Sequence, residues 1–159
     1  MDTDRYGGES FDALYRDSFA AVEGSARWVV GDAQVACEIA QDAFVAALVH
    51  WRNVRRYDNP GAWVRRVAIR QAVRAAQRAR DMPSFAATAV TPDPDVTLDV
   101  RVAVASLPPA QRAAVVLRYM HDLSVSDVAH TLGCSEGTAK THLFRARKTL
   151  AALLAEDDD

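Results

Sequence analysis

Apolar residues recur every three or four positions through the first part of the chain, which is the spacing of amphipathic helices. Ser10 can cap a first helix over residues 11–30 (FDALYRDSFAAVEGSARWVV). The sequence breaks at Gly31 and then offers a second helix over residues 33–51 (AQVACEIAQDAFVAALVHW). These two segments predict a pair of neighbouring helices that bury their apolar faces.

A third helix and a linker follow. Asn59 before Pro60 disfavours helix, whereas Pro60 suits the first turn of a helix that runs to about residue 80. The next stretch, DMPSFAATAVTPDPDV, has three prolines and no periodicity, so we expect an extended linker. The predicted divisions are a flexible N-terminus (1–9), a first domain (10–80), an acidic linker (81–97), a second domain (98–155) and an acidic tail (156–159).

The second domain contains the pattern of a helix-turn-helix. Ser124 can cap a short helix that ends at Gly133, and Ser135 can cap the next one. Ala139, Leu143, Ala146 and Leu150 share one face of that last helix. The opposite face is polar and basic, which favours major-groove DNA over the alternative of a merely solvated helical hairpin. The predicted duplex-binding residues are Ser135, Glu136, Thr138, Lys140, Thr141, Arg145 and Arg147.

Composition supports an all-helical fold, because alanine is abundant, glycine is scarce and β-branched runs are short. The net charge of −2 hides strong segregation. Residues 1–44 carry nine acidic residues, whereas residues 50–80 carry nine arginines against Asp58 alone. One middle segment is therefore suited to an anionic partner.

That segment places arginines 66, 70, 74 and 78 in one helical stripe. Like charges four positions apart destabilise an isolated helix by roughly 0.2–0.5 kcal/mol per pair, so the stripe favours a nucleic acid that would neutralise it. Tyr57 lies in the preceding loop and can stack on an unpaired base. Trp51 and Trp63 are interpreted as core residues.

Several classes of function are excluded. Cys37 and Cys134 form no CxxC pattern, and His130 with Cys134 has no second pair nearby, so we expect no metal and a reducing cytoplasm. The sequence offers no nucleophile–base pattern and no phosphate loop, so we expect neither an enzyme nor a cofactor or small-molecule substrate. No apolar run approaches the ~18 residues of a membrane span, so we expect no membrane insertion.

The stretch LPPAQRAAVVLRYMHDLSVSDVAHTLGCSEGTAKTHLFRARKTL resembles region 4 of the extracytoplasmic-function (ECF) sigma factors of bacterial RNA polymerase. AQDAFVAALVHW and DNPGAWVRRVAI resemble region 2 of the same family, and VRRV and LGCS are similar to an actinobacterial subgroup. The resemblance implies an all-α protein of two small helical domains, a region 2 bundle and a region 4 helix-turn-helix, joined by the linker.

The resemblance also implies partners and site residues. Region 4 would read the −35 promoter element as duplex, and region 2 would read and open the −10 element. The implied −10 contacts are Arg55, Arg56, Tyr57, Asp58, Asn59, Arg66, Arg70 and Arg74. The implied contacts to the β′ clamp helices of the polymerase core are Glu38, Gln41, Asp42 and Phe44, while Leu117 and Tyr119 would meet the β flap. An anti-sigma factor is a further family expectation.

The chain departs from the family pattern at DNA-facing positions. Many relatives have Asn where this chain has Arg70 and Asp where it has Arg74, while His142 and Phe144 replace basic or polar residues. Two alternatives stay open. An autonomous helix-turn-helix regulator would bind DNA without polymerase, and a sigma mimic would sequester an anti-sigma protein without needing the arginine-rich segment.

Overall fold

The computed structural model describes residues 10–82 and 98–155. Within these ranges the chain forms helices α1 to α8 and one π-helical turn, η1, and contains no strand, so the predicted all-α class is confirmed. The predictions for residues 1–9, for 83–97 of the linker and for the tail 156–159 lie outside the described residues. No helix in the described ranges is both long and apolar enough to cross a membrane.

Three long helices make the first half of the structure, residues 10–82. Helices α1, α2 and α4 pack against one another, and the short α3 joins α2 to the loop before α4. The Ser10 hydroxyl accepts a hydrogen bond from the Ala13 N–H at 3.1 Å, and Gly31 ends α1 in the left-handed region at φ 75°. Both predicted ends are confirmed. The bounds are α1 Phe11–Val30, α2 Ala33–Val49, α3 Trp51–Val54 and α4 Pro60–Asp81.

Small residues on α2 bring these helices close together. Ala36, Ala40, Ala43 and Ala47 are fully buried and follow one another at helical spacing along the inner face. Beside them the ring of Phe44 meets three aromatic rings of α1 at centroid distances of 5.0–6.4 Å, those of Phe11, Tyr15 and Phe19. The helices of the first half therefore approach closely along the alanines of α2, and aromatic side chains fill the core around Phe44.

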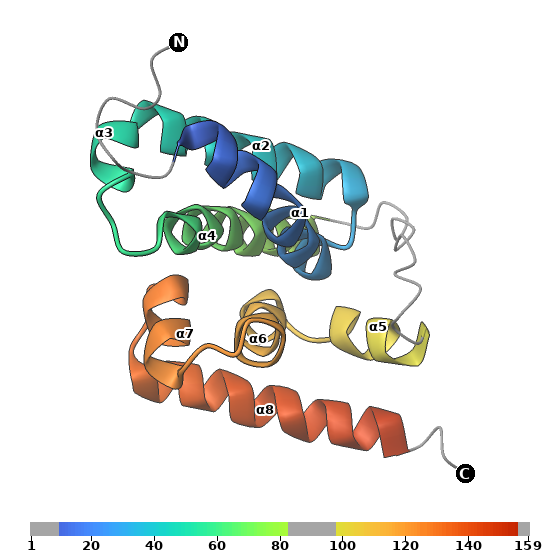
Figure 1. Ribbon diagram of the computed structural model, residues 1–159. Helices are drawn as coiled ribbons and strands as arrows, with labels where there is room; N and C mark the ends of the chain where they lie inside the picture. The colour runs from blue at the N-terminus through green and yellow to red at the C-terminus, as the bar shows by residue number, and fades with distance from the viewer. Residues whose placement is uncertain (1–9, 83–97, 156–159) are drawn as a thin grey trace.

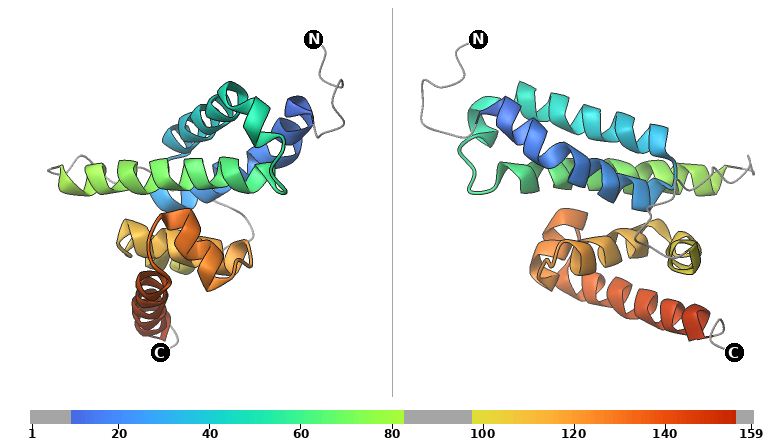
Figure 2. Two further views of the ribbon diagram at one scale, coloured as in Figure 1. Left: turned by 90° about the vertical axis from the view of Figure 1, so that its left-hand side faces the viewer. Right: turned by 45° about the vertical axis from the view of Figure 1, so that its right-hand side comes forward.

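The second half, residues 98–155, is built around the long helix α8. Helices α5, α6 and α7 all pack against α8. In Figures 1 and 2, α6 and α7 lie between α4 and α8, so α8 is the layer farthest from the first half. The bounds are α5 Leu98–Ala105, α6 Pro109–Val115, η1 Val116–Met120, α7 Val125–Leu132 and α8 Glu136–Ala155.

The two halves share one hydrophobic core. Helices α1 and α4 contact α6, and α4 also contacts α7. Ala113, Ala114, Leu117 and Val128 of the second half belong to the same buried cluster as the interior of the first half. The sequence predicts two modules but not that their apolar surfaces merge in this arrangement.

Candidate nucleic-acid interface

The helix-turn-helix is formed by α7, a three-residue turn and α8. The Ser124 hydroxyl accepts from the Asp127 N–H at 3.1 Å and starts α7. Gly133 ends α7 at φ 72°, a left-handed conformation that glycine adopts without steric cost. The Ser135 hydroxyl accepts from the Thr138 N–H at 3.1 Å at the start of α8. The two predicted caps and the predicted turn glycine are confirmed.

The two faces of α8 differ as predicted. Ala139, Leu143 and Ala146 are buried against the rest of the second half. On the outer face the Thr141 hydroxyl donates to the Gly137 carbonyl at 3.0 Å. The structure exposes all seven residues predicted to bind duplex DNA, namely Ser135, Glu136, Thr138, Lys140, Thr141, Arg145 and Arg147.

Two aromatic side chains modify this outer face. Phe144 is 61 % exposed, which makes it an apolar residue among polar neighbours. Arg147 donates to the Tyr119 hydroxyl at 3.2 Å, so its guanidinium is held toward η1. Because DNA-contacting helices read the thymine methyl group with apolar side chains and phosphates with arginine, this face has groups for both contacts.

A second exposed surface is the loop between α3 and α4. Tyr57, at the centre of this loop, is 47 % exposed. Arg56, Asp58 and Asn59 are also exposed, and Arg55 is half-buried. The Asn59 side-chain oxygen accepts from the Ala62 N–H at 3.0 Å and caps α4, which begins at Pro60 as predicted. The loop is thereby anchored at its end while the Tyr57 ring stays accessible for stacking.

Trp51 and Trp63 behave differently from Tyr57. Both are half-buried and pack against the hydrophobic core, which confirms their predicted role. The edge of Trp51 meets the ring of Phe11 at a centroid distance of 5.6 Å.

The arginine stripe of α4 divides into two parts. Arg66 and Arg70 face α7: Arg66 Nη1 lies 2.5 Å from His130 Nε2, and Arg70 donates to two backbone carbonyls of α7. Arg74 and Arg78 are exposed and border a cleft of about 390 Å³ whose other wall is α2. Arg66, Arg70 and Arg74 were all predicted to contact DNA. In this arrangement only Arg74 is exposed, because the side chains of Arg66 and Arg70 contact α7 of the second half.

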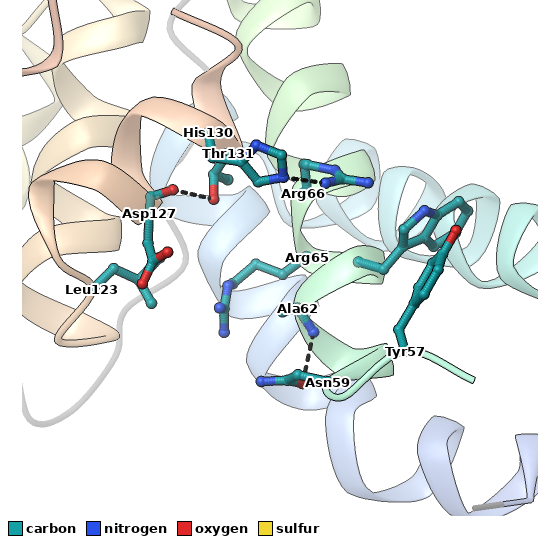
Figure 3. A pocket seen from close by; sticks show the side chains of 10 residues that line it. Tyr57, Asn59, Ala62, Arg65, Arg66, Leu123, Asp127, His130 and Thr131 are labelled. Carbon is teal, nitrogen blue, oxygen red and sulfur yellow. Dashed lines mark hydrogen bonds between the residues drawn. The ribbon is translucent and has the colours of Figure 1, made fainter. Parts of the chain in front are cut away.

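A cleft of about 550 Å³ lies where the loop meets the second half. Figure 3 shows Tyr57 on one side and Leu123 and Asp127 on the other, with Arg65 and Arg66 between them and Asn59 below. Burial lowers the pKa of Arg65, and the Asp127 carboxylate partly offsets this effect. Arg65 Nε is buried and has no hydrogen-bond partner among the described residues.

A third surface lies on α2. Glu38, Gln41 and Asp42 are exposed, as the predicted polymerase-binding role requires. Phe44, however, is 2 % exposed and packs in the aromatic core, so its assignment to a docking surface is wrong.

Sequence reasoning missed the apolar part of this surface. Val45, Leu48 and Val49 are 58 %, 50 % and 73 % exposed. They continue the line of Glu38, Gln41 and Asp42 at steps of three and four residues, and this spacing is the signal that identifies them. The α2 surface is defined by these six residues: Glu38, Gln41, Asp42, Val45, Leu48 and Val49.

The two residues of η1 predicted to contact the β flap, Leu117 and Tyr119, differ in exposure. Leu117 is fully buried and belongs to the shared core, so it cannot meet a partner in this arrangement. Tyr119 and Met120 are 53 % and 49 % exposed. Among residues 10–82 and 98–155 no three His, Cys, Asp or Glu side chains are grouped as they would be to hold a metal ion.

Two family models match the chain, and together they cover both halves. Sigma-70 region 2 matches residues 14–81, and Sigma-70, region 4 matches residues 97–150.

Curated relatives align over nearly the whole chain. The ECF RNA polymerase sigma factor SigM of Mycobacterium tuberculosis is 33 % identical over 95 % of this chain and 79 % of its own length. The RNA polymerase sigma-E factor of Streptomyces coelicolor is 30 % identical over 94 % of this chain and 89 % of its own.

A solved structure has the same fold. The sigma factor RpoE of Bartonella quintana, crystallised with the anti-sigma factor NepR, superposes with a TM-score of 0.76 over 91 % of this chain and 96 % of that one, at 24 % identity.

Proposed function

Because the chain belongs to the ECF family of RNA polymerase sigma factors, we propose that it reads the −35 promoter element as duplex and the −10 element as a melted strand. Polymerase supplies the chemistry, and this chain supplies promoter choice. The observation that carries the proposal is the outer face of α8, whose seven polar residues are exposed on the layer farthest from the first half.

The −35 reading is supported by the geometry of α8. Its N-terminal turn presents Ser135, Glu136 and Thr138, and the side chains that follow on the same face include Lys140 and Arg145. A helix in the major groove contacts base edges with its N-terminal residues, while the basic residues behind them neutralise phosphates.

The −10 reading is supported by the loop that carries Tyr57. An exposed aromatic ring beside Arg55 and Arg56 combines stacking with phosphate attraction, which suits unpaired bases better than paired ones. A protein that binds the melted strand more tightly than the duplex shifts the equilibrium toward melting.

The α2 surface is the proposed site of contact with the β′ clamp helices. It combines the carboxylates of Glu38 and Asp42 with the apolar Val45, Leu48 and Val49. Exposed apolar side chains with a polar border are typical of protein interfaces. An anti-sigma partner stays a prediction.

In-vitro transcription with core polymerase on a promoter library tests the proposal. Promoters with duplex and with premelted −10 regions should both be used, with Tyr57→Ala and Tyr57→Phe compared. Tyr57→Ala should lower initiation on duplex promoters by about 10-fold or more and on premelted ones by less, while Tyr57→Phe retains the ring and the activity. A chain that binds its own operator but never directs core polymerase would instead be an autonomous regulator.

A further inference from the structure

A cleft on the first half has walls of opposite charge. It is the cleft of about 390 Å³ between α2 and α4, two helices that lie side by side (Figure 1). An acidic pair, Glu38 and Asp42, lines it from α2, and a basic pair, Arg74 and Arg78, lines it from α4. All four of these residues are exposed. The rest of the lining consists of Val35, Ile39, Gln71 and Ala75.

The acidic pair and the basic pair do not neutralise each other by direct contact. In the part of the chain that the structure describes, no ion pair or hydrogen bond joins a residue of one pair to a residue of the other. Within each pair the two like charges stand four positions apart on one helix, a spacing at which they repel each other. Each wall of the cleft therefore carries charges that a complementary partner would stabilise.

A nucleic acid fits this cleft poorly. A phosphate bound to the basic pair would also lie close to the carboxylates on the opposite wall, and like charges repel. The formal charges of the two pairs sum to zero, whereas the loop before α4 carries Arg55 and Arg56 against Asp58 alone. The cleft therefore lacks the net positive charge that attracts a polyanion.

A protein helix that carries both signs of charge fits the cleft better. The acidic pair belongs to the α2 surface, which continues along α2 into the exposed Val45, Leu48 and Val49, so the cleft borders that surface directly. Side chains on one face of a helix recur every three or four positions, as the members of each pair do. One partner helix laid along the cleft can therefore meet both pairs, and the opposite charges would fix its register.

We propose that Arg74 and Arg78 contact the polymerase rather than DNA, so that the docking face of region 2 spans α2 and α4. The partner is a helix of the core polymerase that presents basic side chains to Glu38 and Asp42 and acidic side chains to Arg74 and Arg78. This inference rests on the proposed function in taking core polymerase as the partner. It replaces the −10 role that the family resemblance implied for Arg74.

Titration of core polymerase with fluorescently labelled full-length chains tests the inference. Arg78→Glu and Arg74→Glu/Arg78→Glu bring acidic side chains against the acidic side chains of the partner, so they should weaken core binding by about 10-fold or more. Arg80→Glu is the matched control, because Arg80 is also exposed on α4 but does not line the cleft. That variant should bind core polymerase as the unaltered chain does. Melting followed by circular dichroism should show that all variants are folded, since none of the three arginines is buried.

A second titration separates a protein contact from a DNA contact. The probe is a labelled single-stranded oligo-dT of about 20 nucleotides, and Arg74→Gln/Arg78→Gln is compared with the unaltered chain at several salt concentrations without polymerase. The salt slope should be the same for both chains, because the variant loses no phosphate contact. Normal core binding by the charge-reversal variants, or a salt slope reduced by about one or more in the glutamine variant, would overturn the inference. If the unaltered chain itself failed to bind core polymerase, the proposed function would be wrong and this inference with it.

Discussion

The Ser25 hydroxyl lies 2.6 Å from His121 Nε2, although 96 residues separate the two in sequence. The same hydroxyl donates to the Ala21 carbonyl at 2.8 Å, so it is fixed within α1. His121 lies just after η1, in the second half. The contact therefore joins the halves through a group that can change its charge near neutral pH.

This contact predicts a pH-dependent stability. Burial, and then the positive charge of Arg65, lower the pKa of His121 in the folded chain, so folding favours the neutral imidazole. The unfolded chain takes up the proton near the ordinary value of about 6.5. Stability should therefore be full above that pH and should fall as the pH drops toward the lowered pKa. Melting temperatures measured at about pH 7.5 and about pH 5.5 should show the loss.

Two histidine variants separate this effect from others. His121→Gln should flatten the dependence, because it removes the proton that the folded chain resists. Burial and then Arg145 also lower the pKa of His142, so His142→Gln measures that second contribution. If the His121→Gln chain kept the full pH dependence of stability, another titrating group would be its cause.

Phe44 and Val45 are neighbours that should behave oppositely on substitution. Phe44→Ala empties part of the aromatic core and should cost about 3–5 kcal/mol of unfolding free energy in a urea titration. Val45→Ala removes an exposed side chain and should change that free energy by less than about 0.5 kcal/mol, while weakening binding to core polymerase. Normal polymerase affinity in Val45→Ala and Leu48→Ala chains would remove the apolar residues from the docking surface.

Two glycines provide a matched pair for the turn. Gly133→Ala places a Cβ in a left-handed conformation and against Arg70, so it should destabilise the chain by at least about 1–2 kcal/mol. Gly24→Ala lies inside α1 with no atom within 4 Å of the new Cβ, so it should stabilise by about 0.5–1 kcal/mol. Urea unfolding measures both, and equal effects would show that the turn does not require glycine.

Arg145 and Arg147 should contribute differently to −35 binding. In titrations of the polymerase complex with duplex DNA, Arg145→Ala should weaken binding and reduce the salt slope by about one. Arg147→Ala should do the same only if its guanidinium leaves the Tyr119 hydroxyl for a phosphate. Arg16→Ala is the control outside the interface, and an unchanged slope in Arg145→Ala would refute that contact.

Sequence alone located most helix ends because caps are local. The side chains of Ser10, Ser124 and Ser135 each accept a hydrogen bond from a backbone N–H only three residues further along the chain. It was harder to predict which residues of α2 face the core, because apolar residues surround much of that helix. A shift of one residue turns a side chain by about 100° around the helix axis. This is why Val45 was overlooked, whereas the assignment of Phe44 to the docking surface came from the family resemblance and not from the helical spacing.

The partners of Arg66 and Arg70 could not be predicted in the same way. Their contacts on α7 lie 60 to 64 residues away, and nothing in the spacing of the stripe distinguishes a phosphate from a helix end as the acceptor. Both acceptors carry negative charge, so the same arginine pattern fits either. The short α3 and the π-helical η1 were likewise missed, because a single turn has no periodicity to detect.

Arg112 of α6 donates from Nη1 to the Val29 carbonyl in the last turn of α1, and this contact has a consequence for synthesis. A ribosome makes α1, α2 and α4 well before it reaches position 112, so the nascent first bundle must leave the exit tunnel with the Val29 oxygen bonded to water. Only a chain synthesised as far as α6 has the arginine that donates to the Val29 carbonyl. Premature truncation anywhere before α6 would release a bundle whose terminal turn is less stable than in the finished molecule.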